Sequence, residues 1–184
     1  MNPGESGRAS GGREAGSVPI IIRDADERDL PVIAAIFNRE IADSAYVYAE
    51  APTTLDDRRA WLQAHRSAGL PVVVATDPGD PAEVFGWAAL SPYRPASGYR
   101  FTLEASVYVA RASHRRGIGR RLVAALDDLA RARGARAIIA SIDSENAPSI
   151  ALFERFGYVE AARLADVGRK FERWRTQLLL LKNY

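Results

Sequence analysis

The segment from residue 99 to residue 134 restricts the fold of this chain more than any other part of the sequence. Apolar and polar side chains alternate along residues 99–109, which predicts a long strand. A turn with two glycines follows, and leucines then recur at helical spacing up to Gly134, a residue suited to ending a helix. A strand that leads through such a turn into an amphipathic helix predicts an α/β fold, in which helices cover a sheet.

Strands and helices alternate along the rest of the chain as well. Asp26 with Asp29, and Thr54 with Asp57, have the spacing of capping boxes and predict the starts of two helices. The other expected strands are residues 19–23, 71–76, 84–90, 137–142, 158–161 and 174–181. The second and third of these flank a turn rich in proline and glycine and are predicted to pair as a hairpin, so that the sheet is mixed. The leucine run in the last one indicates a strand buried on both faces.

Composition and length exclude several classes of protein. The 184 residues suit one domain, expected at residues 18–184, and the polar residues 1–17 are expected to form a disordered tail. Without cysteine the chain has no thiolate nucleophile and no thiolate zinc site, and no metal is expected. Its 25 basic and 23 acidic residues nearly balance, and no apolar run approaches the roughly 20 residues of a membrane span. We therefore expect a cytoplasmic protein that binds neither nucleic acid nor membranes.

The glycine turn has the features of a site for a phosphate-bearing ligand. It consists of Arg115, Arg116, Gly117, Ile118, Gly119 and Arg120. Two glycines let the backbone approach a ligand closely, and the first N–H groups of the following helix are left unpaired. Arginines in the first turn of a helix oppose its dipole, and a bound phosphate would compensate for that. A dinucleotide-binding loop would have a third glycine where this chain has Leu122, and a solvated basic face is the alternative interpretation.

The turn resembles the signature of the GNAT family of N-acetyltransferases, Gln/Arg-x-x-Gly-x-Gly/Ala between a long strand and a helix, with His114 in the first place. The resemblance implies a mixed, mostly antiparallel central sheet, flanked by helices, in which two neighbouring strands splay apart. It also implies that the amides of residues 115–120 hold the pyrophosphate of acetyl-CoA. The pantetheine arm would lie between the two splayed strands, against the backbone of Val107 and Val109.

A second segment agrees with this family. Asn146 and Ser149, followed by residues 152–158, resemble the family's Asn-x-x-Ser/Ala … Leu-Tyr-Glu-Lys-x-Gly-Phe element. The resemblance implies that Asn146 and Ser149 contact the coenzyme. Asn146 also has the residue type of a helix N-cap, for a short helix expected at about residues 147–156, and both roles are compatible.

The resemblance extends from about residue 20 over nearly the whole chain, towards the subgroup that acetylates phosphinothricin, methionine sulfoximine and methionine sulfone. Three pieces carry this resemblance: residues 93–95 with 102–109, then Asn38, Ile41 and Glu50, and finally residues 168–174. Thr176 replaces the aspartate that the subgroup has after the last piece. The resemblance implies a homodimer and an acceptor site that contains Tyr93, Arg94, Asn38 and Glu104. The planar fork of Arg94 would bind the carboxylate of an amino-acid-like substrate.

Acetyl transfer to nitrogen requires an unprotonated amine, and Glu104 is the candidate for the base that removes the proton. This carboxylate lies within an otherwise apolar strand, on the same face as Thr102, Ser106 and Tyr108. An arginine partner, or exposure to water, is the alternative for Glu104. A backbone N–H at the end of the strand would stabilise the oxyanion. Because the chain has no cysteine, the acetyl group would pass directly to the amine.

The group that protonates the departing thiolate stays open. Phe153 stands where many members of the family have a tyrosine for this step. We predict Tyr108 as the second catalytic residue, with Tyr158 as the alternative. The thiolate, whose pKa in solution is about 8.5, could also leave unassisted. Two other aromatic residues, Trp61 and Trp87, are interpreted as core.

Other functions fit parts of the sequence. The acceptor could be a peptide N-terminus, a polyamine or an aminoglycoside, although a polycationic acceptor would call for an acidic pocket rather than Arg94. A non-catalytic acyl-CoA-binding module would retain the coenzyme without acetyl transfer. An arginine-rich nucleic-acid binder would lack the splayed strands, and its binding would fall steeply with salt. The residues favour an acetyl-CoA-dependent N-acetyltransferase of a small amino-acid-like amine.

Overall fold

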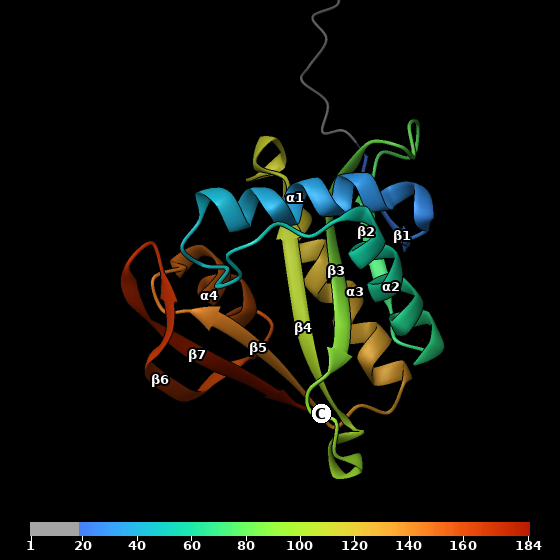
Figure 1. Ribbon diagram of the computed structural model, residues 1–184. Helices are drawn as coiled ribbons and strands as arrows, with labels where there is room; N and C mark the ends of the chain where they lie inside the picture. Colours follow the sequence, from blue (N-terminus) through green and yellow to red (C-terminus); the bar gives the residue numbers. More distant parts are fainter. Residues whose placement is uncertain (1–18) are drawn as a thin grey trace, which may run out of the picture.

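The structure, a computed structural model, describes residues 19–184, and the tail expected at residues 1–17 lies outside them. Within the described residues seven strands form one sheet, in the order β1-β2-β3-β4-β5-β7-β6 (Figure 1). The strands are β1 Ile21–Asp24, β2 Val72–Thr76, β3 Val84–Pro92, β4 Thr102–Val109, β5 Ala137–Asp143, β6 Val159–Lys170 and β7 Arg173–Asn183. β4 and β5 run parallel, and the other neighbouring pairs are antiparallel. The mixed, mostly antiparallel sheet is confirmed.

Helices cover both faces of this sheet. They are α1 Leu30–Asp43, α2 Leu55–Ser67, α3 Ile118–Ala132 and α4 Ala147–Glu154. α1 and α2 lie over one face of the β2–β4 part of the sheet, and α3 lies over the other (Figure 1). Ile118 and Leu122 of α3 belong to one buried cluster, whereas Ile33 of α1 and Leu62 of α2 pack with Trp87 in another. No helix in residues 19–184 has both the length and the apolar character that a membrane crossing requires.

The predicted helix starts are confirmed. The side chain of Asp26 caps a short 3₁₀ helix that leads into α1, and Asp29 completes the capping box. At α2 the amide of Asp57 donates to the Thr54 hydroxyl at 3.1 Å, and the amide of Thr54 donates to the Asp57 carboxylate at 2.8 Å. α3 ends just before Gly134, whose φ of +70° lies in the left-handed region that favours glycine.

β4 and β5 pair only over their first residues and then separate. The paired positions are Thr102 with Ala137, Leu103 with Ile138 and Glu104 with Ile139. Beyond these, β4 continues beside β3, and β5 continues beside β7. Residues 105–109 and 140–143 therefore border an opening between two strands that are neighbours at their start. The splayed strand pair implied by the family resemblance is confirmed.

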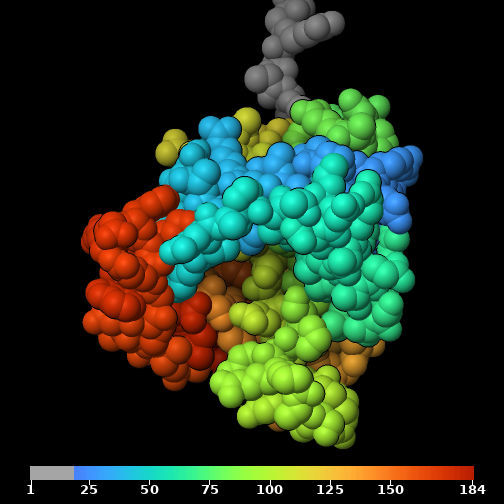
Figure 2. Space-filling model, in the orientation of Figure 1, coloured from blue at the N-terminus to red at the C-terminus, as the bar shows by residue number. Residues whose placement is uncertain are grey.

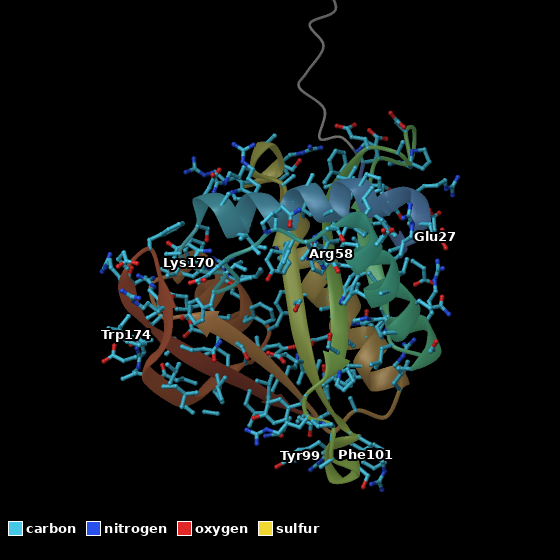
Figure 3. All side chains as sticks on the ribbon, viewed as in Figure 1. Glu27, Arg58, Tyr99, Phe101, Lys170 and Trp174 are labelled. Carbon is cyan, nitrogen blue, oxygen red and sulfur yellow. The ribbon has the colours of Figure 1, made fainter. Side chains whose placement is uncertain are left out.

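β4 is shorter than the alternation of its sequence predicts. It begins at Thr102 rather than at Tyr99, which instead ends a 3₁₀ helix formed by residues 97–99. Phe101, just before the strand, is 47% exposed. Tyr99 and Phe101 lie at the end of the molecule that is farthest from α1 (Figure 3). Apolar and polar residues go on alternating before Thr102, but this pattern describes only the order of the side chains. Whether a residue belongs to the strand depends on backbone hydrogen bonds, which the pattern does not show.

The C-terminal hairpin is longer than predicted. β6 runs from Val159 to Lys170 instead of ending near residue 161, and nearly all its side chains are exposed or half-buried. Its pairing with β7 uses backbone groups, which leave no hydrophobic pattern in the sequence. In β7 the leucines at 178 and 180 are buried, whereas those at 179 and 181 are half-buried. Only one face of β7 is therefore fully covered.

Candidate active site

The glycine turn joins β4 to α3 and leaves backbone amides for a ligand. Gly117 has a φ of +75° and stands at the start of α3, where no side chain caps the helix. By helix geometry the amides of Ile118, Gly119 and Arg120 have no intrahelical acceptor, so they can bind an anion. A Cβ at Gly119 would lie 3.0 Å from the side chain of Leu152 in α4, so glycine also permits close packing there.

The arginines near this turn have different surroundings. Arg111 forms ion pairs with α1, and Arg121 donates to a backbone carbonyl at residue 20. The guanidinium of Arg116 stacks on an aromatic ring of β3 at 4.3 Å. Arg115 and Arg120 are exposed. The basic cluster of the sequence is therefore only partly available to a phosphate. The backbone amides of the turn do not depend on these side-chain contacts and remain available.

The other predicted coenzyme contacts border the opening between β4 and β5. Val107 and Val109 belong to the part of β4 that no longer pairs with β5. Asn146 follows the end of β5 and caps α4, because its Oδ1 accepts a hydrogen bond from the amide of Ser149 at 3.3 Å. The structure thus places these residues on two sides of the opening, with the glycine turn at the end of β4.

Glu104 is the last residue of β4 that pairs with β5, so it stands where the opening begins. Its side chain is half-buried, and its Oε1 accepts a hydrogen bond of 2.6 Å from the hydroxyl of Ser141 in β5. In the described part of the chain it has no cationic partner, so the arginine pair considered above is not found. Ser141 fixes one carboxylate oxygen and leaves the other to accept a proton.

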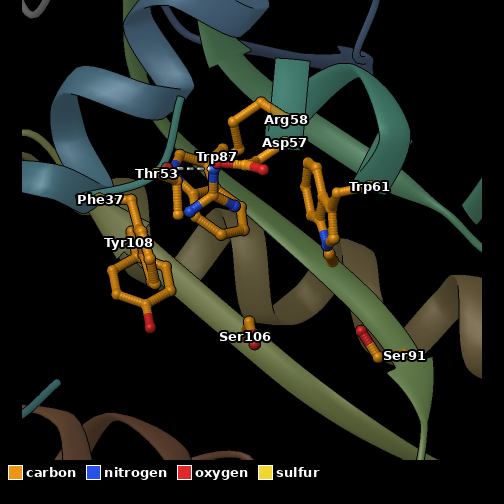
Figure 4. A pocket seen from close by; sticks show the side chains of 10 residues that line it. Phe37, Thr53, Asp57, Arg58, Trp61, Trp87, Ser91, Ser106 and Tyr108 are labelled. Carbon is orange, nitrogen blue, oxygen red and sulfur yellow. Dashed lines mark hydrogen bonds between the residues drawn. The ribbon is translucent and has the colours of Figure 1, made fainter. Parts of the chain in front are cut away.

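The face of β4 that carries Glu104 continues onto β3 and forms the floor of a cavity. Ser91 lies opposite Glu104, and Trp87 lies opposite Tyr108. The molecule is hollowed on this face beneath the segment that joins α1 to α2 (Figure 2). The cavity has a volume of about 460 Å³, within the usual range for small-molecule sites. It is lined by Phe37, Thr53, Asp57, Arg58, Trp61, Trp87, Ala89, Ser91, Ser106 and Tyr108 (Figure 4).

Several lining residues were not predicted to belong to a site. Trp61 and Trp87 were expected in the core, and although Trp87 is indeed only 2% exposed, both line the cavity. Arg58 had no role in the sequence-based site. Arg58, Trp61 and Leu62 recur at helical spacing, which places the arginine on the inner face of α2. That spacing is the signal in the sequence that could have identified Arg58.

Of the two tyrosines considered for thiolate protonation, Tyr108 faces the cavity. Burial raises the pKa of Tyr108 to about 12, so the phenol keeps its proton at neutral pH. Its ring stacks on Trp87 with the ring centres 4.7 Å apart. Tyr158 instead packs on Phe153 in the core beside α3, and its hydroxyl donates to Asp127 at 3.2 Å.

The residues predicted to bind the acceptor lie around the cavity and not among its lining residues in the described part of the chain. Arg94 is exposed on the loop after β3, with its guanidinium 5.1 Å from the ring of Tyr93. This loop starts beside the Glu104 end of β4. Asn38 forms two hydrogen bonds of 2.8 Å with the backbone of Thr53, so it fixes the segment that joins α1 to α2.

Comparison with known proteins identifies the family. Residues 35–158 match the model of the acetyltransferase (GNAT) family. The chain belongs to the GNAT family. This acetyltransferase is 40% identical over 153 residues to an L-methionine sulfoximine/L-methionine sulfone acetyltransferase of Pseudomonas paraeruginosa. The matched residues cover 83% of this chain and 88% of the relative. It is 38% identical over 162 residues to a phosphinothricin N-acetyltransferase of Alcaligenes faecalis, over 86% of this chain and 80% of that protein.

A solved structure gives the same result for the fold and the coenzyme. The acetyltransferase resembles a GNAT superfamily phosphinothricin acetyltransferase from Sinorhizobium meliloti in complex with acetyl-CoA. The TM-score is 0.85 at 29% identity, over 89% of this chain and 88% of that one. The enzyme therefore uses acetyl-CoA as its co-substrate. Its residues fit this group, because the free amides of the glycine turn suit a pyrophosphate and the opening beside β4 suits an extended arm.

Proposed function

We propose that this acetyltransferase acetylates the α-amine of a small amino acid of the phosphinothricin, methionine sulfoximine or methionine sulfone type, with Glu104 as the base. The names of the two relatives support this class of substrate. The observation that carries the proposal is the place of Glu104. Its carboxylate stands at the start of the opening for the coenzyme and on the face that forms the cavity floor. An amine bound in the cavity can therefore contact the Glu104 carboxylate and also reach the opening for the coenzyme.

The mechanism follows from the residues around this point. Bound acetyl-CoA supplies the acetyl group as a thioester. The ammonium form of an α-amine, with a pKa of about 8–10, predominates at neutral pH, so Glu104 takes a proton from its nitrogen directly or through one water. As the N–C bond forms and the C–S bond breaks, Tyr108 donates its phenolic proton to the sulfur. The second proton that the nitrogen loses on becoming an amide replaces the phenolic proton of Tyr108 through water, and Glu104 releases its own proton to solvent. A backbone N–H near the end of β4 stabilises the negative charge on the carbonyl oxygen.

A thiol-release assay with acetyl-CoA tests the substrate class. The panel contains phosphinothricin, methionine sulfoximine, methionine sulfone, methionine, an alanyl peptide and a polyamine. We expect kcat/KM for the best of the first three to exceed that for the peptide and the polyamine by at least about tenfold. A peptide or polyamine as the best acceptor would overturn the substrate assignment.

Replacement of Tyr108 by phenylalanine tests the proton donor. We expect kcat to fall by about 10- to 100-fold, because the departing sulfur loses its proton source. KM for acetyl-CoA should change little, and the loss should be constant between about pH 6 and pH 9, since the phenol stays protonated there. Steady-state kinetics across this range provides the measurement. Tyr46→Phe, at a 41% exposed tyrosine, is the control, and an unchanged kcat for Tyr108→Phe would show that the thiolate leaves unassisted.

A further inference from the structure

The cavity contains a buried cation without an anionic partner in the described chain. Arg58 is 6% exposed, and its Nε donates to the hydroxyl of Thr53 at 3.1 Å. No carboxylate of residues 19–184 forms an ion pair with its guanidinium. Asp57 lines the same cavity, but its carboxylate accepts hydrogen bonds from the amide and the hydroxyl of Thr54. The two terminal nitrogens of Arg58 therefore donate no hydrogen bond within the described residues.

Aromatic rings hold this guanidinium in place. Its central carbon lies 4.1 Å from the ring centre of Phe37, 5.2 Å from that of Trp61 and 5.7 Å from that of Trp87. The group lies between Phe37 and Trp61 and is directed towards Ser106 (Figure 4). Burial lowers the pKa of Arg58, but a guanidinium stays charged in proteins. Cation–π contacts offset part of the cost of burial and leave the N–H donors unpaired.

A second donor in the same cavity has no acceptor. The indole N–H of Trp87 is buried and makes no hydrogen bond within residues 19–184. Buried polar groups in proteins are almost always paired, so an unpaired one in a binding cavity needs an explanation. The indole nitrogen of Trp87 is itself closed off from solvent, whereas Arg58 lines the cavity, so the unpaired guanidinium is the donor that indicates a ligand with acceptors of partial or full negative charge.

The position of Arg58 indicates which part of an amino acid it contacts. The guanidinium packs on Trp87, which lies opposite Tyr108, and Tyr108 is four residues along β4 from Glu104, so the Cα atoms of Tyr108 and Glu104 are about 13 Å apart. An α-carboxylate is bonded to the same carbon as the amine, so a contact between Arg58 and this carboxylate would draw the amine towards the Tyr108 end of β4 and away from Glu104. Oxygens at the end of the side chain lie farther from the amine than the α-carboxylate does, so Arg58 can bind them while the amine stays near Glu104. Arg94, beside the Glu104 end, remains the predicted partner of the carboxylate.

We propose that Arg58 binds the oxygen atoms at the end of the acceptor side chain, a sulfone, sulfoximine or phosphinate group, and that it selects such amino acids over methionine. This inference rests on the proposed function. The planar fork of Arg58 offers parallel N–H donors to two acceptors on one atom, the two oxygens of a sulfone or phosphinate or the oxygen and imine nitrogen of a sulfoximine. The rings of Phe37 and Trp61 pack on the methylene and methyl groups. A thioether sulfur is a weak acceptor, so methionine leaves the buried cation unpaired and binds worse.

The test compares kcat/KM for methionine sulfone and methionine in four proteins: the wild type, Arg58→Met, Arg58→Lys and Arg59→Met. Arg59, the neighbour on α2, is exposed and pairs with Asp56, so its variant is the control. We expect Arg58→Met to lower the ratio of kcat/KM for sulfone over thioether by about 30-fold, chiefly through KM for the sulfone. Arg58→Lys keeps the charge without the fork and should give an intermediate ratio.

A second readout separates recognition from folding. The fluorescence of Trp61 and Trp87 on titration with methionine sulfone, in the presence of coenzyme A, should change in the wild type and in Arg59→Met but not in Arg58→Met. The melting temperature of Arg58→Met measures its folding. Equal losses for both amino acids would mean that Arg58 holds the carboxylate or only the fold, and would overturn the inference. If the wild type acetylates methionine sulfone and Arg58→Met keeps the same preference, only this inference fails, whereas no acetylation of phosphinothricin, methionine sulfoximine or methionine sulfone by the wild type refutes the proposed function.

Discussion

Replacing Glu104 with glutamine lowers kcat/KM for the best amino-acid acceptor by about 10²- to 10³-fold at neutral pH. Glutamine has nearly the same shape, and its carbonyl oxygen can still accept the hydrogen bond from Ser141. The β4–β5 contact and the opening beyond it are therefore preserved, but an amide cannot take a proton from an ammonium group. KM for acetyl-CoA should stay within about twofold, because the amides predicted to bind the coenzyme lie beyond the far end of β4. Steady-state kinetics measures both quantities.

The dependence of this loss on pH identifies its cause. The α-amine deprotonates in solution as the pH rises through about 8–10, so the need for a base diminishes and Glu104→Gln should recover relative to the wild type. A loss that is the same at every pH would mean that the carboxylate orients the acceptor and does not take its proton. Glu83→Gln, at an exposed acid in the β2–β3 turn, is the matched control. Activity of Glu104→Gln within about twofold of the wild type would exclude Glu104 as the base.

The parts of the fold that the sequence predicts are those in which side chains carry the signal. The capping boxes at Asp26 and Thr54 fix helix starts through contacts within four residues, and both are found. Gly134 ends α3 because glycine adopts its positive φ without strain. β6 has no such signal, since its side chains face solvent and its backbone pairs with β7, so its extension to Lys170 could be found only in the structure.

The candidate site likewise contains features that the sequence predicts and features that only the structure shows. The glycine turn is local, and the splayed strands were implied by the family resemblance, so both could be stated before the structure. Ser141 as the partner of Glu104 depends on the register of β4 against β5, which no pattern within either strand specifies. Arg58 was missed because its role depends on how α2 packs on β3. An arginine on a helix is normally solvated, and only the surrounding rings show that this one is buried.

A buried ion pair stabilises the far side of the opening. Arg175 of β7 donates two hydrogen bonds to the carboxylate of Asp143 at the end of β5, of 2.9 and 2.7 Å. The hydroxyl of Tyr48 and the amide of Glu145 also donate to this carboxylate, each at 2.9 Å. The side chains of Asp143 and Arg175 are 0% and 2% exposed. Asp143 thus joins the segment before α2, the hairpin and the approach to Asn146.

Replacing Asp143 with alanine lowers the free energy of unfolding by about 3–5 kcal/mol, because the change leaves the Arg175 guanidinium buried with only the half-exposed Glu145 as an anionic partner. Urea denaturation of the wild type and the variant measures the difference. Asp128→Ala, at an exposed aspartate of α3, is the control and should change stability by no more than about 0.5 kcal/mol. KM for acetyl-CoA should rise in Asp143→Ala, since Asn146 and Ser149 follow the loosened end of β5.

A double variant and a pH series show whether the ion pair is the cause. Asp143→Ala/Arg175→Met removes the stranded charge as well, so it should be more stable than Asp143→Ala alone. Burial by itself would raise the pKa of Asp143, but the hydrogen bonds from Arg175, Glu145 and Tyr48 outweigh it and hold the pKa below its usual range. A carboxyl with a depressed folded pKa contributes stability above its unfolded pKa, about 4, and loses it as the pH falls through the folded value. The difference between the wild type and Asp143→Ala should therefore be full at pH 7 and shrink below about pH 4. A double variant no more stable than the single one, with a difference independent of pH, would mean that packing at this position, and not the ion pair, stabilises the end of β5.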